Sequence, residues 1–480
     1  MPKVPVLIVG AGPTGLTLGC ELARRGVACR VVDKSPELFI GSRAKGLQPR
    51  TLEVLEDMGV LDAIWAQGSP FPPFRLYSGT KLLWERSLEE MLGTAAIPPS
   101  TRTPYTRPWL IPQWRTDRIL AEHFMELGGR LDLATELTGF TQDERGVQAT
   151  LTHQGNSEEV RAEYLIGADG GRSFVRKTLG VSFEGETHTT ERTLIGDIKA
   201  TGLEGPGCHM LTHSGDVTSR FSLWSLPGTD YFQFVATVAA DDVPPLTVES
   251  IQELLEQRTG RTDVRLSELR WSSLYKINVR MVARFRVGRV FLAGDAAHVH
   301  SSAGGQGLNT GIQDAYNLGW KLAAVLRGAP PSLLDSYESE RLPVAARVLG
   351  LTSSLHQQNF RPPTAPAPAI HQLDITYRDS VLAVDERSAP GELRAGDRAP
   401  DARLPNGSRL FDAFRGTHFT LLSFRHVDMK VDERVRVLSV EALDGYDVPQ
   451  GHFVLIRPDG YVGAITPSEI TIGDSLRQMM

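Results

Sequence analysis

The chain has 480 residues, of which 41% are hydrophobic and 22% charged, and its formal net charge is −6. This length predicts two or three domains, and the ordinary composition excludes a collagen-like, coiled-coil or largely disordered protein. The acidic balance argues against nucleic acid and anionic membrane surfaces as partners.

Cysteine content and apolar runs bear on the compartment. Cys20, Cys29 and Cys208 are too few for a disulfide framework and have no CxxC spacing, which favours a reduced, cytoplasmic protein. The apolar segment 4–23 is interrupted by Gly10, Gly12, Pro13 and Gly15, so it is predicted to be strand, turn and helix rather than a signal peptide. No run of 18 uninterrupted apolar residues occurs, and no membrane-spanning helix is expected.

The N-terminal segment carries the clearest motif. A short buried strand is predicted at 4–10, a helix at 13–26 and a second strand at 27–35. The turn between the first strand and the helix reads GAGPTG, and the second strand ends in an acid, Asp33. This arrangement predicts a dinucleotide-binding βαβ unit.

Each glycine of that turn has its own physical role. Gly10 allows the tight turn, Gly12 lets the backbone approach a pyrophosphate, and Gly15 lets helix and strand pack closely. The helix N-terminus presents free N–H groups and partial positive charge to the phosphates. Asp33 can accept hydrogen bonds from both ribose hydroxyls. The motif alone leaves NAD and FAD open.

Further elements follow in chain order. Their patterns predict helices at 47–60, 116–128 and 309–328, a hairpin leading into a buried strand at 147–170, an antiparallel sheet at 185–275, and a strand and loop at 288–298. The Pro-rich stretch 66–108 is interpreted as a crossover into a second domain. The Pro/Ala stretch 360–370 is interpreted as a linker to a small αβ domain.

A DG motif follows the buried strand near residue 167. Asp169 stands next to Gly170, and Arg176 falls on the helix that follows. Asp169 can hold backbone amides or bridge toward a phosphate. Taken alone, a DG turn and a helix capped by Ser173 explain the pattern equally well without a ligand.

A second glycine-rich segment opens with Gly294 and Asp295 and continues through Gly304 and Gly305 into the helix predicted at 309–328. His298 and His300 stand two residues apart, so they point to opposite faces of an extended loop. Neither has a carboxylate or cysteine partner nearby in sequence, and we expect neither a metal site nor a general base there.

These three motifs in this order, with the segments SRAKGLQPRTLEVLEDMG and IPQWRTDRIL, resemble the para-hydroxybenzoate hydroxylase-like flavoprotein monooxygenases over residues 3–355. The C-terminal segments GDRAPDARL and VLIRPDGYVGA resemble the thioredoxin-like tail of many such enzymes. The resemblance implies an α/β protein with four parts: a Rossmann-type FAD-binding domain of the glutathione reductase-like type (1–70, 105–185 and 276–358), an inserted β-sheet substrate domain (71–104 and 186–275), a linker and helix (359–390), and a thioredoxin-like αβ domain (391–480).

The same resemblance implies a set of cofactor contacts. The turn Gly10–Gly15 would bind the FAD pyrophosphate, Asp33 the adenosine ribose, and Asp295 the ribityl or pyrophosphate region. Two backbone amides at a helix N-terminus would stabilise the anionic reduced flavin by about 0.3–2 kcal/mol. The implied cofactor-binding residues are Gly10, Gly12, Pro13, Thr14, Gly15, Asp33, Lys34, Arg43 (beside the cofactor), Gln113 (flavin side), Leu137 (backbone contact to adenine), Asp169 (FAD and NAD(P)H), Gly294, Asp295, Gly304, Gly305, Gly307, Leu308 and Asn309.

The chemistry implied is aromatic hydroxylation. NAD(P)H, bound transiently, would reduce FAD, and O2 would then give a C4a-hydroperoxide that transfers one oxygen atom to an electron-rich ring. The flavin carries this chemistry, so neither a catalytic side chain nor a metal is expected. The expected substrate is phenolic or polycyclic, polyketide- or antibiotic-like, and the protein is expected to be a monomer or a homodimer.

Aromatic hydroxylation has three alternatives. A Baeyer–Villiger oxygenase on the same scaffold, or a non-catalytic flavin protein that sequesters an aromatic compound, stays open at the level of sequence. None of the seven tryptophans has the Trp-x-Trp spacing of a flavin halogenase.

No cysteine follows Cys208, so a redox role for the thioredoxin-like tail is excluded, whereas a packing or dimer-related role remains.

Substrate contacts are expected from the predicted antiparallel sheet. Its apolar candidates for a ring-binding wall are Phe221, Leu223, Trp224, Phe232 and Phe234. The alternative, that such residues are sheet core, applies to about half of them by our reading of the pattern.

Overall fold

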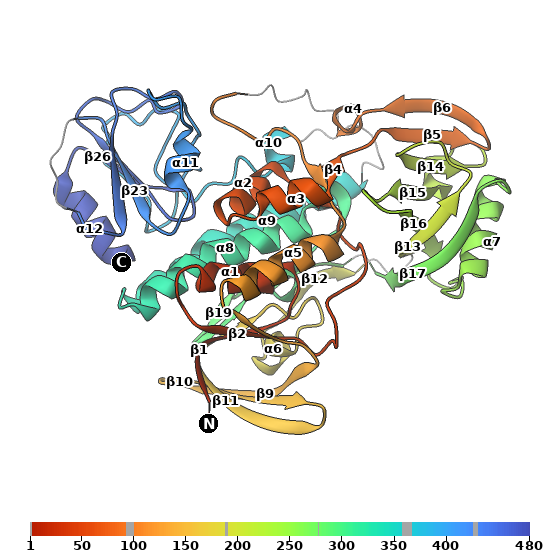
Figure 1. Cartoon of the computed structure of the whole chain (residues 1–480), viewed down its shortest axis with the longest axis horizontal. Helices are drawn as coiled ribbons and strands as arrows, with labels where there is room; N and C mark the ends of the chain where they lie inside the picture. Colours follow the sequence, from red (N-terminus) through yellow and green to blue (C-terminus); the bar gives the residue numbers. More distant parts are fainter. Residues whose placement is uncertain (1, 93–99, 188–190, 277, 358–366, 426–430) are drawn as a thin grey trace.

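The computed structural model describes residues 2–92, 100–187, 191–276, 278–357, 367–425 and 431–480 (Figure 1). Most of the linker expected at 360–370 therefore falls outside the described residues. Helix α10 (Ala367–Ile370) covers its described end.

A mostly parallel sheet lies beneath the central helices. Its parallel part has the strand order β20-β11-β1-β2-β8. The bounds are β1 (Lys3–Val9), β2 (Cys29–Val32), β8 (Arg130–Asp132), β11 (Asn156–Gly167) and β20 (Val290–Leu292), with antiparallel additions β9 (Thr135–Asp143), β10 (Gly146–His153) and β19 (Arg286–Val287). Val6, Leu7 and Ile8 are completely buried, as continuous apolar runs in parallel strands require.

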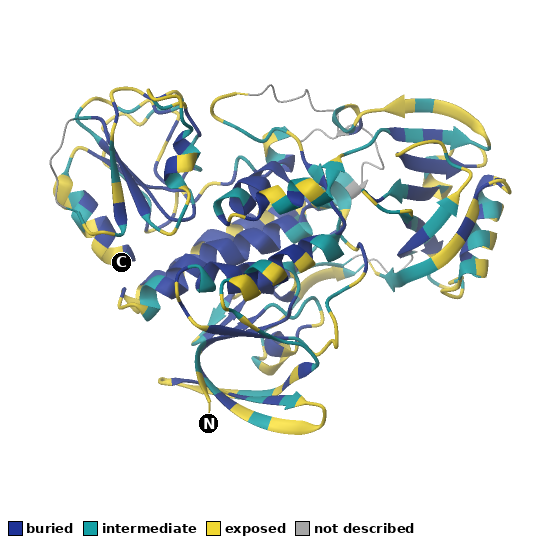
Figure 2. Cartoon of the chain, viewed as in Figure 1, coloured by how far each residue is buried: buried dark blue, intermediate teal, exposed yellow. Residues whose placement is uncertain are grey.

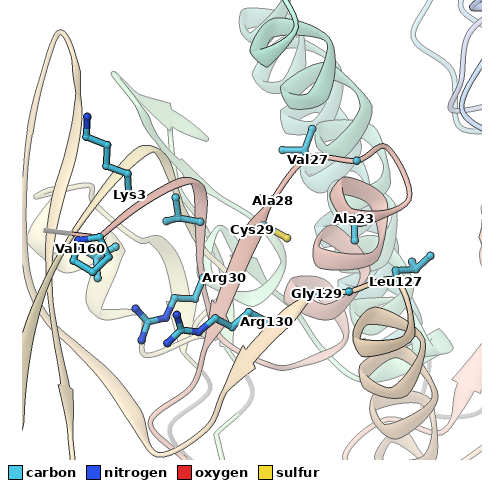
Figure 3. Close-up of a pocket in the computed structure, with 14 residues that line it drawn as sticks. Lys3, Ala23, Val27, Ala28, Cys29, Arg30, Leu127, Gly129, Arg130 and Val160 are labelled. Atoms are coloured by element: carbon cyan, nitrogen blue, oxygen red, sulfur yellow. The ribbon is translucent and has the colours of Figure 1, made fainter.

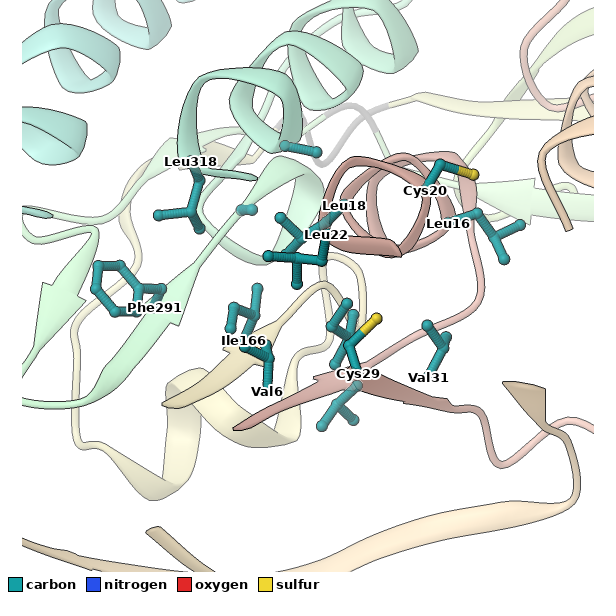
Figure 4. Close-up of a cluster of buried hydrophobic side chains, with 14 of the residues drawn as sticks. Val6, Leu16, Leu18, Cys20, Leu22, Cys29, Val31, Ile166, Phe291 and Leu318 are labelled. Atoms are coloured by element: carbon teal, nitrogen blue, oxygen red, sulfur yellow. The ribbon is translucent and has the colours of Figure 1, made fainter. Parts of the chain in front are cut away.

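Helices pack on this sheet and against one another. They are α1 (Pro13–Ala23), α2 (Pro49–Asp57), α3 (Leu61–Gln67), α5 (Gln113–Glu126), α6 (Phe174–Thr178), α8 (Gly307–Leu326) and α9 (Asp335–Gln357). Leu18 and Leu22 of α1 lie over Val6 and Ile166 of the sheet, near Leu318 of α8 (Figure 4). Helix α8 is buried along most of its length (Figure 2), and α9 was not expected from the sequence.

Helices α1 and α8 are in direct contact, which brings the two glycine-rich segments together. A Cβ atom at Gly311 would stand 2.4 Å from Thr14 Oγ1, and one at Gly319 would stand 2.6 Å from the Cβ of Glu21. Larger side chains would separate the helices at both points. The close packing therefore explains how a segment far downstream reaches the N-terminal motif.

A seven-stranded sheet with the order β17-β13-β16-β15-β14-β5-β6 lies on the opposite side of the central helices from the C-terminal end of the chain (right in Figure 1). Its strands are β5 (Phe74–Ser78), β6 (Lys81–Arg86), β13 (Glu191–Thr201), β14 (Cys208–Thr212), β15 (Phe221–Ser225), β16 (Tyr231–Ala239) and β17 (Arg265–Tyr275). Chain segments before and after the parallel sheet's β11 thus meet in one sheet, because β5 pairs in parallel with β14. Helix α7 (Val248–Thr259), which the sequence did not predict, covers one face.

Two three-stranded sheets and one short helix complete this part of the fold. The first small sheet consists of β3 (Gly46–Leu47), β7 (Trp109–Leu110) and β4 (Ser69–Pro70), and the second of β12 (Glu184–Thr187), β18 (Asn278–Met281) and β21 (His298–Val299). The short helix is α4 (Leu88–Leu92). The sheet of β3, β7 and β4 lies where the chain passes between the two large sheets.

The C-terminal part is a separate αβ unit packed on α8 and α9. Its sheet has the order β22-β26-β25-β23-β24, from β22 (Val384–Asp385), β23 (Phe419–Ser423), β24 (Val435–Ser439), β25 (Phe453–Ile456) and β26 (Val462–Thr466), with α11 (Leu410–Phe414) and α12 (Glu469–Met479). Trp320 of α8 meets Phe419 edge to face at 5.9 Å. The chain is thus an α/β protein with a Rossmann-type domain, a β-sheet domain and a small C-terminal αβ domain.

Candidate active site

The predicted motif residues gather at one edge of the parallel sheet. Gly10 follows β1, Asp33 follows β2, Asp169 follows β11, and Gly294 and Asp295 follow β20. These are the carboxyl ends of neighbouring parallel strands. Open α/β sheets bind their ligands at this edge.

The three glycines of the N-terminal turn have different surroundings. Gly10 has a φ of +112°, and a Cβ there would lie 2.3 Å from the Ala168 carbonyl oxygen. A Cβ at Gly15 would lie 2.0 Å from the carbonyl oxygen of Gly10. Gly12 has an ordinary φ of −84°, and its Cβ would meet no protein atom within 4 Å. Gly12 therefore leaves an open space in front of the N-terminus of α1, which Pro13 and Thr14 begin.

Asp33 is held beside this turn. Its Oδ2 accepts a hydrogen bond from the Ala11 amide at 2.8 Å, and its Oδ1 accepts one from the Ser35 amide at 2.8 Å. Each carboxylate oxygen keeps a second lone pair for a ligand hydroxyl. Lys34 is exposed. Leu137 is buried near the start of β9, and the amide of Thr135, the first residue of that strand, donates to the Asp33 carbonyl oxygen at 2.8 Å.

Asp169 and Arg176 organise the second motif. Asp169 Oδ2 accepts from the amides of Phe174 and Val175 at 2.7 and 3.1 Å, so it holds the start of α6. Arg176 donates to the carbonyl oxygens of Gly171 and Ala296, both at 2.9 Å. This arginine ties the DG motif to the segment that contains Asp295.

Behind the Gly294–Asp295 segment lies a buried ionic cluster. His298 Nε2 and Arg341 Nε each lie 2.7 Å from a carboxylate oxygen of Asp314, and the Gly294 amide donates to Asp314 at 3.1 Å. Burial alone would raise the pKa of Asp314, but Arg341 and His298 hold it below its usual value. His298 has no carboxylate partner nearby in sequence, but α8 supplies Asp314 from 16 residues downstream. The cluster is structural, and Asp295 itself is exposed.

The N-terminus of α8 lies next to this segment. Gly304 and Gly305 have φ values of +74° and +63°, and Gly305 is exposed. The helix begins at Gly307, two residues earlier than predicted. The amides of Gly307, Leu308 and Asn309 therefore precede the first helical hydrogen bond, and they are free to bind a ligand group.

A loop of residues 39–48, here called the anchor loop, is fixed to this helix end. The side chain of Asn309 accepts from the Gln48 amide at 2.7 Å and donates to the Gly46 carbonyl at 2.9 Å. Gln113 exchanges two hydrogen bonds with the backbone of Ala44, at 2.9 and 3.2 Å. Gln113, expected on the flavin side, thus acts on the loop.

The other side of the anchor loop packs on the seven-stranded sheet. The guanidinium of Arg43 lies over the rings of Phe39 and Trp271, at 5.4 and 5.8 Å from their centroids. A Cβ at Gly41 would stand 2.4 Å from the Trp271 ring. The face of the sheet that contacts the loop is called the loop face below.

Most of the predicted ring-binding wall lies on the opposite face. Phe221, Leu223 and Phe234 are completely buried in a cluster with Ile251 and Leu255 of α7, and Phe232 packs against the same cluster. These four residues therefore follow the alternative stated above, in which they form the core of the sheet. Apolar alternation marks one side of a strand as core, but it does not say which side faces a neighbouring domain.

Trp224 is the exception, because it belongs to the loop face. A single cross-strand row there contains Trp271, Asp197, Gln233, Trp224, Cys208 and Phe74. Sequence reasoning missed Asp197 and Gln233, although Asp197 stands between Gly196 and Ile198 and Gln233 between Phe232 and Phe234. The Nζ of Lys45, from the anchor loop, lies 4.2 Å from the Trp224 ring centroid.

A surface groove lies at the other end of the parallel strands (Figure 3). It is lined by the beginning of β1 and β2 and by the C-terminal ends of α1 and α5, including Lys3, Cys29 and Leu127. Helix C-termini carry partial negative charge, which disfavours phosphate. We therefore do not assign the dinucleotide to this groove.

No three His, Cys, Asp or Glu side chains come together as a metal-binding group in the described part of the chain, and no helix among those residues is long and apolar enough to cross a membrane.

Comparison with known proteins agrees with this geometry. Residues 3–352 match a family model described as an FAD binding domain, and residues 392–480 match one described as the C-terminal region of aromatic-ring hydroxylases. A flavin-dependent monooxygenase of Mycobacteroides abscessus is 58% identical over 99% of this chain and 100% of its own length. A rifampicin monooxygenase of Streptomyces venezuelae is 36% identical over 95% and 94%.

A solved structure of similar fold is a ternary complex of aklavinone-11 hydroxylase with FAD and aklavinone. It has a TM-score of 0.85 and 30% sequence identity, and the match covers 100% of this chain and 99% of that one. The family matches, the relatives and this fold agree with the glycine turn, the acidic residues at the strand ends and the free helix N-terminus. The chain therefore belongs to the FAD-dependent aromatic-ring hydroxylases, a family of flavin monooxygenase enzymes.

Proposed function

We propose that this enzyme is an NAD(P)H-dependent hydroxylase of a phenolic or polycyclic, polyketide- or antibiotic-like substrate. The observation that carries the proposal is the anchor loop, which connects the free N-terminus of α8 to the aromatic and polar loop face of the sheet. Relatives named for rifampicin, anhydrotetracycline and pentachlorophenol support the aromatic substrate class.

The residues at the carboxyl edge fit FAD. The open space at Gly12 and the N-terminus of α1 would hold the pyrophosphate, while Asp33 would bind the ribose and Asp295 the ribityl region. The amides of Leu308 and Asn309 would face the ring. On this basis we propose the cofactor role for 1–70, 105–185 and 276–358, and the substrate role for 71–104 and 186–275.

The protein's contribution is binding, orientation and exclusion of water. Bound FAD, once reduced by NAD(P)H, would supply the activated oxygen atom for the ring. The free amides at the N-terminus of α8 would favour the anionic form of the reduced ring by about 0.3–2 kcal/mol. The sequence has one GxGxxG unit, which supports transient binding of the nicotinamide cofactor.

The compartment and the C-terminal domain belong to the same proposal. Cys20, Cys29 and Cys208 are free and buried, which supports residence in the reducing cytoplasm. The C-terminal domain has no cysteine, so we propose that it stabilises the FAD domain by packing.

The test measures NAD(P)H oxidation by the purified FAD-loaded enzyme with rifampicin, anhydrotetracycline, aklavinone and pentachlorophenol as candidate substrates, followed by mass and NMR analysis of products. Faster NAD(P)H oxidation, with a product that carries a new ring hydroxyl, is the expected result. An ester or lactone product would instead indicate Baeyer–Villiger oxygenation. Compounds that bind and are recovered unchanged, without faster flavin reduction, would indicate a sequestering protein and contradict the proposal.

A further inference from the structure

The loop face of the sheet carries buried polar groups that the proposed hydroxylation does not yet use. Asp197 and Gln233 are opposite each other on β13 and β16, and Gln233 is opposite Trp224 on β15. Asp197 and Gln233 are both completely buried. Burying such groups is costly unless they are paired, so their presence between two domains calls for an explanation.

Lys45 reaches this row from the anchor loop. Its Nζ donates to Gln233 Oε1 and lies 4.2 Å from the Trp224 ring centroid. The backbone of Lys45 is fixed on the other side, because the Ile111 amide donates to its carbonyl oxygen at 2.9 Å. The ammonium is therefore held in place on the loop face, with two further N–H donors available.

The carboxylate of Asp197 lies close enough to the Lys45 ammonium to interact with its charge. Neither of its carboxylate oxygens has a hydrogen-bond partner of good geometry among the residues that the structure describes. The hydroxyl and the amide of the adjacent Ser42 are nevertheless close enough to lower the pKa of Asp197. The carboxylate thus acts on Lys45 through its charge rather than through a direct bond.

We propose that Lys45 binds the ionised phenolic or enolic oxygen of the substrate, and that Asp197 is the positioning residue that keeps Lys45 charged. The inference rests on the proposed function and names the chemical class of the substrate. When a neutral phenol binds, the O–H bond breaks, its electron pair stays on the substrate oxygen, and the proton passes to solvent. An ionised oxygen donates electron density into the ring, which makes the ring easier to oxygenate.

Charges on every neighbouring element set the pH range of this site. Burial lowers the pKa of Lys45 to about 8, although the negative charge of Asp197 opposes the change. Burial also raises the pKa of Asp197 to about 6, against contacts with Ser42 and the charges of Arg270 and Lys45. Cys208 stays a neutral thiol because burial raises its pKa. The other cations nearby are Arg43 on the same loop, Arg270 on β17, and Arg220, whose pKa burial lowers to about 10.

The test uses the FAD-loaded enzyme and alizarin, a polycyclic phenol whose anion absorbs at longer wavelength than oxidised flavin. Spectrophotometric titration gives the apparent pKa of the bound dye. We expect the wild type to favour the anion by about tenfold or more, the size of one hydrogen bond to a charged group. Lys45→Met is expected to abolish this preference, and Lys45→Arg to keep part of it.

Two further variants separate a charge effect from a loss of structure. Asp197→Asn is expected to move the upper pH limit of anion binding to lower pH, because Lys45 loses a neighbour that raises its pKa. Lys199→Met is the matched control, since Lys199 lies near the end of the same strand as Asp197 and pairs at 2.9 Å with the exposed Glu268. FAD content is measured for every variant.

Three results would overturn the inference: an unchanged anion preference in Lys45→Met, binding of the neutral dye by the wild type, or no binding of the dye at all. Oxygenation of the candidate substrates is measured on the same samples. Loss of oxygenation with the anion preference intact would count against the proposed function and leave the role of Lys45 standing.

Discussion

Glycines of one motif differ in whether the protein or a ligand requires them. Gly10 and Gly15 are required by the fold, because an added Cβ would collide with a backbone carbonyl in each case. Gly12 has a backbone conformation open to any residue and nothing near its Cβ position. A glycine is therefore needed at position 12 only because a ligand binds in front of α1.

This difference gives a prediction for two substitutions. Gly12→Val should leave the stability of the FAD-free protein within about 0.5 kcal/mol of wild type, while FAD content falls at least tenfold. Gly15→Ala should destabilise the FAD-free protein by about 1–3 kcal/mol, because strand and helix must separate. Thermal unfolding of the FAD-free proteins and flavin absorbance of the loaded ones check both. Wild-type FAD content in Gly12→Val would contradict the proposed pyrophosphate site.

At the scale of the element, the N-terminus of α8 is placed by packing rather than by its own sequence. Gly311 lets α8 approach Thr14 at the start of α1, and the Asp314 cluster fixes the loop in front of the helix. The position of the free amides relative to the GxGxxG turn therefore depends on the contact between α1 and α8.

A double substitution tests this dependence. Gly311→Ala should lower stability by about 1–3 kcal/mol and weaken FAD binding, because the new methyl group would stand 2.4 Å from Thr14 Oγ1. In the Thr14→Ala background the same change should cost much less, since the nearest remaining atom of that side chain, its Cβ, is 3.7 Å away. The coupling is read from unfolding and FAD titration of all four proteins. Additive effects would show that the two helices do not limit each other here.

Some helices and strands were predicted correctly from the sequence and others were not. Strands β1, β2, β11 and β20 and helices α1, α5 and α8 were predictable because apolar periodicity, glycine turns and the acids after the strands all agree. The short strand β8 was not predicted. Helix α7 was missed inside a stretch with strand-like alternation, although Thr247 caps its start and Gly260 ends it. The loop face was missed for a different reason. Which side of a sheet meets a neighbouring domain depends on tertiary contacts, so Trp224 and its four apolar neighbours looked alike in sequence.

On the scale of the whole molecule, the C-terminal domain is joined to α8 and α9 by buried charges. Arg457 lies 2.6 Å from Glu340 and 2.5 Å from Asp459, while Lys321 of α8 lies 2.7 Å from Glu340. All four side chains are essentially inaccessible to solvent. Removal of one member would leave buried charge without its partner, which typically costs 3–5 kcal/mol. The domain therefore holds the helix whose other end faces the proposed flavin ring.

This cluster makes stability depend on acid pH in a definite direction. Burial alone would raise the pKa of Glu340, but Arg457 and Lys321 hold it far below its usual value. The folded protein therefore binds fewer protons at Glu340 than the unfolded chain does. Its stabilising contribution is complete above the unfolded glutamate pKa of about 4.3 and is lost as pH falls below it.

We expect Glu340→Gln to lower the melting temperature at neutral pH and to flatten its decline between about pH 5 and 3. The slope of the unfolding free energy against pH should fall by at most the amount that one bound proton contributes. Glu441→Gln, which removes an exposed carboxylate from the same C-terminal domain, is the control and should follow the wild-type curve. Limited proteolysis along the same pH series should release the C-terminal domain earlier in Glu340→Gln. If that variant kept the acid dependence of the wild type, carboxylates other than Glu340 would govern it, because Glu340 would then contribute no pH-dependent stability.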